Sequence, residues 1–337
     1  MVTGRRALVT LLASALLLLA TLVLCPLVGS THVSLRKAAE AGFDVWQSPD
    51  AAILLVARLP RTLLAALVGG GLAVCGAVFQ AMLRNPLATP FTLGVSAGGA
   101  LGAVAAIKAG FTGAIWGIGG LPAAAFAGSA LTIASVWLLA RRDGALPAGA
   151  LLLSGITINL FLSSLILLIH YLADFAESHQ MVRWLMGGLD IVDIRVVLRL
   201  LPFILVGLGA LLWHARDYNV LSLGDEPAAA LGVDVRRLQR LTFFAASLVV
   251  GAVVSAAGPI GFVGLIVPHL VRLLAGPDHR VVLPASFLAG GAFLVACDTL
   301  ARTLIAPAEL PVGVITAIFG GPFFLWVLRS RREEVCE

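Results

Sequence analysis

The chain has 337 residues, of which 60% are hydrophobic and only 12% are charged, with a formal net charge of +5. Soluble domains carry about 25% charged residues, so most of this protein's surface must face hydrocarbon. The composition excludes an ordinary soluble domain and indicates a single all-α domain, residues 1–337, that crosses a membrane many times.

Ten apolar segments predict ten transmembrane helices, because a span needs about 20 residues. The first segment follows Arg5 and Arg6 with a run of uncharged residues longer than the core of a signal peptide. No small-residue cleavage site precedes Cys25, so we expect this segment to remain as an anchor. The ten segments are 7–28, 51–82, 91–109, 114–140, 148–172, 196–214, 241–257, 260–276, 281–301 and 308–328.

The distribution of cations predicts the orientation. If the amino terminus is inside the cell, the inner connections hold 14 of the 23 lysine and arginine residues, whereas the acidic residues divide equally between the two sides. This bias follows the positive-inside rule, so both termini are predicted to be cytoplasmic. The topology accounts for the positive net charge of the chain. Because no basic patch interleaved with aromatic residues occurs, no nucleic-acid partner is expected.

Two connections carry residues that break helices. Asn85-Pro86 and Pro90 interrupt the second and third segments, and Gly258-Pro259 and Pro268 interrupt the seventh and eighth. Irregular backbone within a membrane is tolerated where it lines a solute path or packs on protein. Five segments lie on each side of residue 190, so halves of about 1–190 and 191–337 suit an inverted repeat with the path near their boundary.

Glycine is frequent on the same helices. Gly94, Gly98 and Gly102 recur at every fourth position, and Gly69 and Gly76 lie in the preceding segment. Small residues allow helix backbones to approach closely in a membrane. We therefore expect tight helix contacts, with which a role in lining the path is compatible.

Ionisable groups inside the predicted spans are few. Asp298 and Arg302 are four residues apart and can pair along a helix, and the alternative is a proton site. Ion-driven carriers usually bind the coupling ion at intramembrane charges, so an ion-coupled secondary transporter is disfavoured. No GxxxxGK[ST] motif occurs, which places any ATP hydrolysis on another chain.

The residues that carry enzyme chemistry are also missing. Ser96 follows Gly94 without the full GxSxG pattern, and no HExxH motif occurs, so we expect no enzyme activity from this chain. His269 and His279 lack metal-ligand neighbours and are interpreted as structural. Isolated cysteines predict neither a metal centre nor a cofactor; they are Cys25, Cys75, Cys297 and Cys336.

The connection 221–240 contains a predicted short helix. Asp225-Glu226-Pro227 is a favourable start, because proline suits a first turn and acids suit the positive end of the helix dipole, and Gly232 can end the helix. A capped helix between spans on the cytoplasmic side is interpreted as a lever that contacts a partner. A plain connector is the alternative.

Five segments of the chain carry a resemblance to a known family. They are RLPRTLLAALVGGGLAVCGAVFQAMLRNPLATPFTLGVSAGGALGA (58–103), RWLMGGL (183–189), LSLGDEPAAALGV (221–233), GPIGFVGLIVPHLVRLLAGPDHRVVLPA (258–285) and AELPVGVITAIFGGPFFLWVL (308–328). Together they resemble the FecCD family of ABC-importer permeases, to which vitamin B12, ferric-siderophore and haem permeases belong. The resemblance implies a ten-helix type II importer fold in a bacterial inner membrane. It also implies a dimer of two copies with the solute path on the two-fold axis, two ATP-binding subunits and a substrate-binding protein.

The resemblance also implies residue roles. Three outer cations are similar to exposed rim charges that meet acidic side chains on the two lobes of a binding protein, namely Arg58, Arg61 and Arg302. The alternative is that they anchor the ends of the spans at the lipid headgroups. The inner gate corresponds to Asn85, Pro86 and Leu87, with a second constriction at Ala148 and Gly149. The loop that enters the ATP-binding subunit corresponds to Gly224, Asp225, Glu226, Ala230, Leu231 and Gly232.

The function that the resemblance implies is alternating access in an ATP-driven importer of a metal chelate. A ferric siderophore is the expected cargo. Haem or cobalamin is the alternative within the same family.

Overall fold

The computed structural model describes residues 4–29, 31, 33–34, 36–37, 48–111, 113–115, 118–141, 145–189 and 193–335. Apart from one short antiparallel hairpin, regular structure in this part of the chain is helical. Seven of its helices are long and apolar enough to cross a membrane, and three shorter apolar helices complete the predicted ten.

The long spans begin with α1 (Gly4–Leu24), which η1 (Cys25–Leu27) extends, and with one continuous helix made of α3 (Pro49–Ala52), η3 (Ile53–Arg58) and α4 (Leu59–Met82). The others are α6 (Gly120–Ala140), α7 (Ala148–Tyr171), α9 (Ile194–Trp213), α12 (Val235–Ala257) and α14 (His279–Thr303). The shorter apolar helices are α5 (Val95–Lys108), which η4 (Pro90–Leu93) precedes, α13 (Val263–Ala275) and α15 (Val312–Val335). Outside the spans lie α8 (Phe175–Leu185), α10 (Ala215–Leu221) and α11 (Asp225–Ala230).

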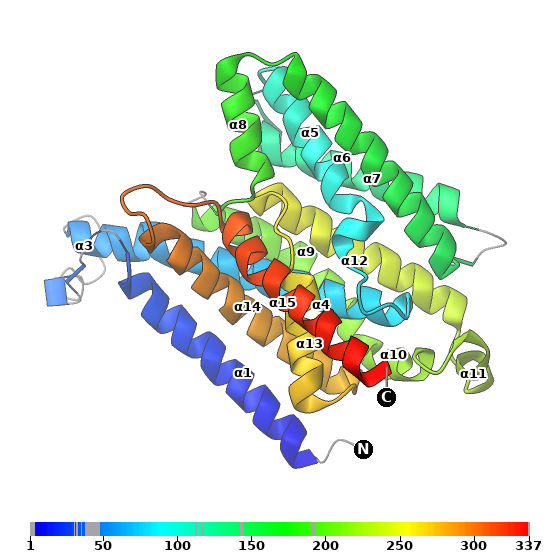
Figure 1. Cartoon of the computed structure of the whole chain (residues 1–337). Helices are drawn as coiled ribbons and strands as arrows, with labels where there is room; N and C mark the ends of the chain where they lie inside the picture. Colours follow the sequence, from blue (N-terminus) through cyan, green and yellow to red (C-terminus); the bar gives the residue numbers. More distant parts are fainter. Residues whose placement is uncertain are drawn as a thin grey trace.

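Helix α4 forms the centre of the bundle. Its most apolar stretch is 83% buried, compared with 11% for α1 and 17% for α7. It packs against α14, α12, α13 and α9, while α5, α6 and α7 form a neighbouring layer (Figure 1). The peripheral helices α1 and α7 therefore direct most of their apolar side chains outward, as lipid-facing helices do.

Close glycine contacts hold α4 to its neighbours, as the sequence predicts. A methyl group on Gly76 would lie 1.9 Å from the carbonyl oxygen of Gly264 on α13. One on Gly69 would lie 2.2 Å from the carbonyl oxygen of Gly290 on α14. Backbone cannot move aside as a flexible side chain can, so both crossings require glycine.

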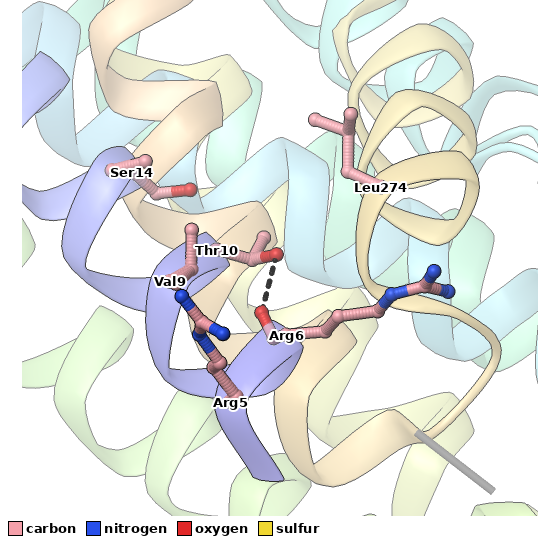
Figure 2. Close-up of a pocket in the computed structure, with 7 residues that line it drawn as sticks. Arg5, Arg6, Val9, Thr10, Ser14 and Leu274 are labelled. Carbon is pink, nitrogen blue, oxygen red and sulfur yellow. Dashed lines mark hydrogen bonds between the residues drawn. The ribbon is translucent and has the colours of Figure 1, made fainter. Parts of the chain in front are cut away.

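The bundle has two ends, which we name from the chain. At the terminal face α1 begins and α15 ends, and at the opposite face α1 ends and α4 begins (Figure 1). At the terminal face the first turns of α1 leave a cavity that Leu274 of α13 also lines (Figure 2). Both chain ends therefore lie on one side of the bundle, as the even number of spans predicts.

Some predicted boundaries are wrong. The fourth segment was expected from residue 114, but α6 begins at Gly120 because β1 (Ala114–Ile115) and β2 (Ile118–Gly119) form the hairpin. Helix α8 was not predicted, because its 11 residues are too few and too polar for a span. Its start is a capping box, in which Asp174 accepts from the Glu177 amide and Glu177 accepts from the Asp174 amide.

Candidate functional site

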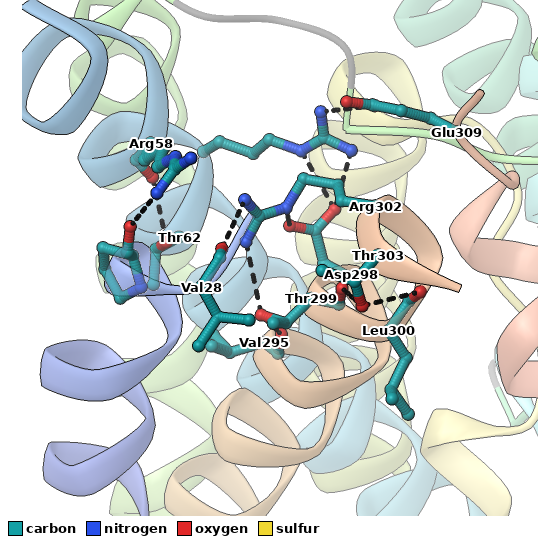
Figure 3. Close-up of polar contacts among 12 residues, drawn as sticks. Val28, Arg58, Thr62, Val295, Asp298, Thr299, Leu300, Arg302, Thr303 and Glu309 are labelled. Carbon is teal, nitrogen blue, oxygen red and sulfur yellow. Dashed lines mark hydrogen bonds and ion pairs between the residues drawn. The ribbon is translucent and has the colours of Figure 1, made fainter. Parts of the chain in front are cut away.

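At the opposite face a buried ionic cluster joins α4 to α14. We call it the Arg61–Asp298 cluster, and its side chains come from two helices and the loop after α14 (Figure 3). Arg61 Nε donates to Asp298 Oδ1 at 3.0 Å, and its Nη1 donates to Glu309 Oε2 at 2.8 Å. Arg302 Nε donates to the other carboxylate oxygen of Asp298 at 3.1 Å. The predicted Asp298–Arg302 pair is confirmed, and because guanidinium groups bind both oxygens of Asp298, the geometry favours pairing over a proton site.

Arg58 completes the cluster through backbone acceptors. Its Nη1 donates to the Pro26 carbonyl oxygen at 3.0 Å, and its Nη2 donates to the Thr31 carbonyl oxygen at 2.7 Å. Arg302 Nη1 contacts the Val28 carbonyl oxygen at 3.4 Å. These contacts attach the chain that follows α1 to two places, the start of α4 and the end of α14.

The expectation that the three predicted docking cations are exposed rim charges is wrong for this structure. Arg58, Arg61 and Arg302 are 6%, 9% and 7% exposed. The Glu309 side chain is 47% exposed, so it is the cluster's most accessible charge. The error has a physical reason, since buried carboxylates and carbonyls compensate buried guanidinium groups and make burial tolerable. Docking on this surface stays a prediction.

The Asn-Pro break lies at the terminal face and follows the sequence prediction. Helix α4 ends at Met82 and α5 begins at Val95. The Leu87 amide donates to Asn85 Oδ1 at 2.9 Å, which forms a local turn around Pro86. Leu87 is 45% exposed. The three predicted gate residues therefore form a turn that presents an apolar side chain at the end of the central helix.

Arg84 lies directly before this turn and has an unusual backbone conformation. Its φ is +48°, which is unusual for a residue with a side chain. Its guanidinium lies 3.1 Å from the Asp225 carboxylate at the start of α11. The break and the predicted coupling helix thus contact each other within one chain. Sequence reasoning missed Arg84, and its place beside Asn85-Pro86 was the only available signal.

Helix α11 matches the predicted short helix. Gly224 precedes it with a φ of +121°, and the helix runs from Asp225 to Ala230. Ala228 is buried, whereas Leu223 and Leu231 are 63% and 65% exposed. An exposed leucine therefore lies at each end of this short helix, next to its two acidic residues. The remaining predicted coupling residues, Glu226, Ala230 and Gly232, lie on the same exposed segment.

A polar anchor fixes the segment that carries α11. On α10, Asn219 Nδ2 donates to Asp278 at 2.7 Å, and its Oδ1 accepts from the His279 amide at 2.8 Å. A bond from the Arg280 guanidinium holds the pKa of Asp278 well below its usual value, so this acceptor stays ionised. Tyr218 is fully buried and bonds Thr242 at 2.8 Å. The anchor joins α10 to the start of α14 and gives His279 the structural role predicted for it.

The residues of the predicted second constriction lie at the start of α7, and the second helix break lies between α12 and α13. Ala148 and Gly149 form the first turn of α7, and Gly149 has open space where a Cβ would be. The second break lies between Ala257 and Val263, as predicted. There Gly188 donates to the Ala257 carbonyl oxygen at 2.9 Å, which ties the chain after α8 to the end of α12.

The described residues contain no group of three metal-ligating side chains. The ring of His269 packs edge-on against Phe323 at 6.1 Å, in keeping with the structural role predicted for it. Cys25, Cys75 and Cys297 are free, whereas Cys336 lies outside the described residues.

Comparisons with known proteins agree with this architecture. The sequence model of the FecCD transport family matches residues 16–330. A cobalamin import system permease protein, BtuC of Halobacterium salinarum, is 48% identical over 84% of this chain and 75% of its own length. An Fe(3+)-citrate import system permease protein, YfmD of Bacillus subtilis, is 40% identical over 91% of this chain and 90% of its own.

A solved structure extends the likeness to the fold. It is described as an inward-facing conformation of a metal-chelate type ABC transporter, and it matches with a TM-score of 0.83 and 32% identity. The match covers 96% of this chain and 99% of the other. The chain therefore belongs to the FecCD transport family, and its fold is that of a multi-pass permease of ABC importers.

Proposed function

We propose that this chain moves a metal chelate across a bacterial inner membrane as one of two identical permease subunits, driven by two ATP-binding subunits. The observation that carries the proposal is the contact between α11 and the Asn-Pro break. The short helix exposes apolar and acidic side chains to a partner, while Asp225 reaches back to Arg84. A partner that moves α11 therefore acts directly on the end of the central helix.

The direction of transport follows from assigning the two faces. The terminal face, with α11 and both chain ends, is the cytoplasmic side in this proposal, in line with the positive-inside bias. The ATP-binding subunits dock there on α11. The opposite face, with the Arg61–Asp298 cluster, then receives a substrate-binding protein on the outer side.

The burial of the outer arginines changes how docking must work. An acidic side chain of a binding protein that reaches Arg61 displaces Glu309, since this carboxylate already occupies Arg61 Nη1. Docking therefore exchanges one carboxylate for another on the same guanidinium. Such exchange favours orientation and specificity over a large gain in affinity.

Alternating access then needs two discrete arrangements of the break. Closure of the ATP-binding subunits displaces α11, and the Arg84–Asp225 contact passes this displacement to Asn85-Pro86 and Leu87. Because the break has no α-helical ladder to preserve, it can change its backbone angles without disturbing the core of α4. The solute path runs between the two copies.

The cargo is proposed as a ferric chelate, with a siderophore as the first candidate. The 40% identical iron(III)-citrate permease supports this class. Cobalamin is the second candidate, because the cobalamin permease is 48% identical. Haem is the third candidate, because a hemin transport system permease protein, HmuU of Yersinia pestis, is 41% identical over 84% of this chain. All are bulky metal complexes that a path at a dimer axis could accommodate.

Uptake by reconstituted vesicles decides between these cargoes. The complete complex with its binding protein is supplied with equal concentrations of a ferric hydroxamate siderophore, ferric citrate, cobalamin or haem, each labelled with its metal isotope. We expect ATP-dependent accumulation of a ferric chelate and none of free iron(III) or free cobalt(II). Accumulation of cobalamin alone would replace the first candidate by the second. Accumulation of none of the complexes would contradict the proposed cargo class.

A further inference from the structure

The cavity at the start of α1 does not belong to the proposed transport site. It has a volume of about 760 Å³ and lies on the outside of the bundle at the terminal face (Figure 2). Ligand sites commonly occupy about 300–1,000 Å³, so the space suits a sizeable molecule. Its lining consists of Arg5, Arg6, Val9, Thr10, Ala13 and Ser14 of α1 with Leu274 of α13.

Positive charge dominates this cavity. Arg5 extends alongside Val9, and Arg6 extends across toward α13 (Figure 2). Among the described residues, no acidic side chain lines the cavity. Neither guanidinium has a hydrogen bond or ion pair with the described part of the chain. The Thr10 hydroxyl already donates to the Arg6 carbonyl oxygen at 2.9 Å, so the two guanidinium groups and the Ser14 hydroxyl are the polar side-chain groups left to meet a ligand.

The walls of the cavity are apolar and belong to helices that face lipid. Val9 on α1 is 56% exposed, and Leu274 on α13 is 70% exposed. Neighbouring side chains on both helices, Leu12 and Leu273, are also more than half exposed. Side chains of this kind on a transmembrane helix meet hydrocarbon. The cavity therefore joins two cations at the membrane surface to an apolar groove that opens to the bilayer.

We propose that this cavity binds an anionic phospholipid of the cytoplasmic leaflet. The phosphate accepts hydrogen bonds from the guanidinium groups of Arg5 and Arg6, whose planar donors suit phosphate oxygens. One acyl chain lies along Val9, Ala13 and Leu274. A basic pocket between transmembrane helices on the cytoplasmic side is the form that recognition of anionic lipids takes. The proposal does not depend on which cargo the protein carries.

The test measures lipid retained by the purified full-length protein. Protein in neutral detergent is incubated with equal amounts of phosphatidylglycerol and phosphatidylcholine, and bound lipid is counted by native mass spectrometry. The wild type is expected to retain phosphatidylglycerol preferentially. The double variant Arg5→Gln/Arg6→Gln should lower its affinity about 30-fold, because each arginine near an anionic lipid contributes roughly a factor of five. A matched control, Arg236→Gln/Arg237→Gln, removes two exposed arginines that do not line the cavity and should leave retention unchanged.

Two further arms separate a built lipid site from simple charge attraction. Ala13→Phe keeps both cations but fills the groove, and it should also lose phosphatidylglycerol while eluting as folded protein. Inorganic phosphate at the same concentration as the lipid should not compete. Unchanged retention in Arg5→Gln/Arg6→Gln or in Ala13→Phe, equal loss in the control, or competition by phosphate would each overturn the proposal.

Discussion

Replacing Asp298 by Asn is expected to destabilise the protein by about 3–5 kcal/mol, the cost of removing one partner from a buried ion pair. Asp298 is 1% exposed and binds both Arg61 and Arg302, each at 3.0–3.1 Å. The amide keeps the shape of the side chain but leaves two guanidinium groups without their shared charge. Thermal unfolding in detergent, followed by the loss of the monodisperse size-exclusion peak, measures the effect.

Glu309 provides the matched control within the same cluster. It also binds Arg61, but its side chain is 47% exposed, and an exposed ion pair is worth only about 0.2–1 kcal/mol. Glu309→Gln should therefore unfold close to the wild-type temperature. Equal unfolding temperatures for Asp298→Asn and Glu309→Gln would mean that the cluster is not held together by its buried carboxylate.

Reversing either charge of the Arg84–Asp225 contact is expected to uncouple transport without unfolding the protein. Both side chains are well exposed, at 40% and 49%, so the pair contributes little to stability. If the contact passes the movement of α11 to the break, Arg84→Asp or Asp225→Arg should lower uptake per ATP hydrolysed by about 5- to 150-fold. This is the fold-change to which typical coupling free energies between two sites correspond. The measurement is parallel uptake and ATP hydrolysis in vesicles that contain the complete complex.

The exchanged pair, Arg84→Asp with Asp225→Arg, distinguishes this account from a direct role of Asp225 on the ATP-binding subunit. The exchange restores the contact and should recover most of the uptake. Glu226→Arg is the matched control on the next residue, and Arg84→Asp should not rescue it. Failure of the exchange, with normal assembly of the complex, would assign Asp225 to the partner subunit.

The spans could be predicted from the sequence because hydrophobic length is a local property. The helix breaks at Asn85-Pro86 and Gly258-Pro259 were predictable for the same reason, since proline removes a donor and glycine permits positive φ. Asp298 and Arg302 are one helical turn apart, so their pairing also followed from spacing. Each of these features depends on residues close together in the chain.

The remaining features depend on contacts across the chain. Arg61 is separated from Asp298 by 237 residues and from Glu309 by 248, so no local pattern could show that these charges are buried together. Large separation along the chain also made two other contacts unpredictable. They are the contact between Arg84 and Asp225, and the hydrogen bonds of Asn219 to the start of α14. Local patterns therefore could not show which charged side chains are buried together and which are exposed at either face.

The central claim is that ATP on partner subunits drives movement of cargo through this chain. Its most direct test is the initial rate of chelate uptake into vesicles that contain this chain with its ATP-binding subunit and binding protein. With proton and sodium gradients collapsed by ionophores, uptake should continue while ATP is present and stop when the ATP-binding subunit is omitted. Uptake by this chain alone that follows an imposed proton or sodium gradient, and that ATP does not change, would contradict the account.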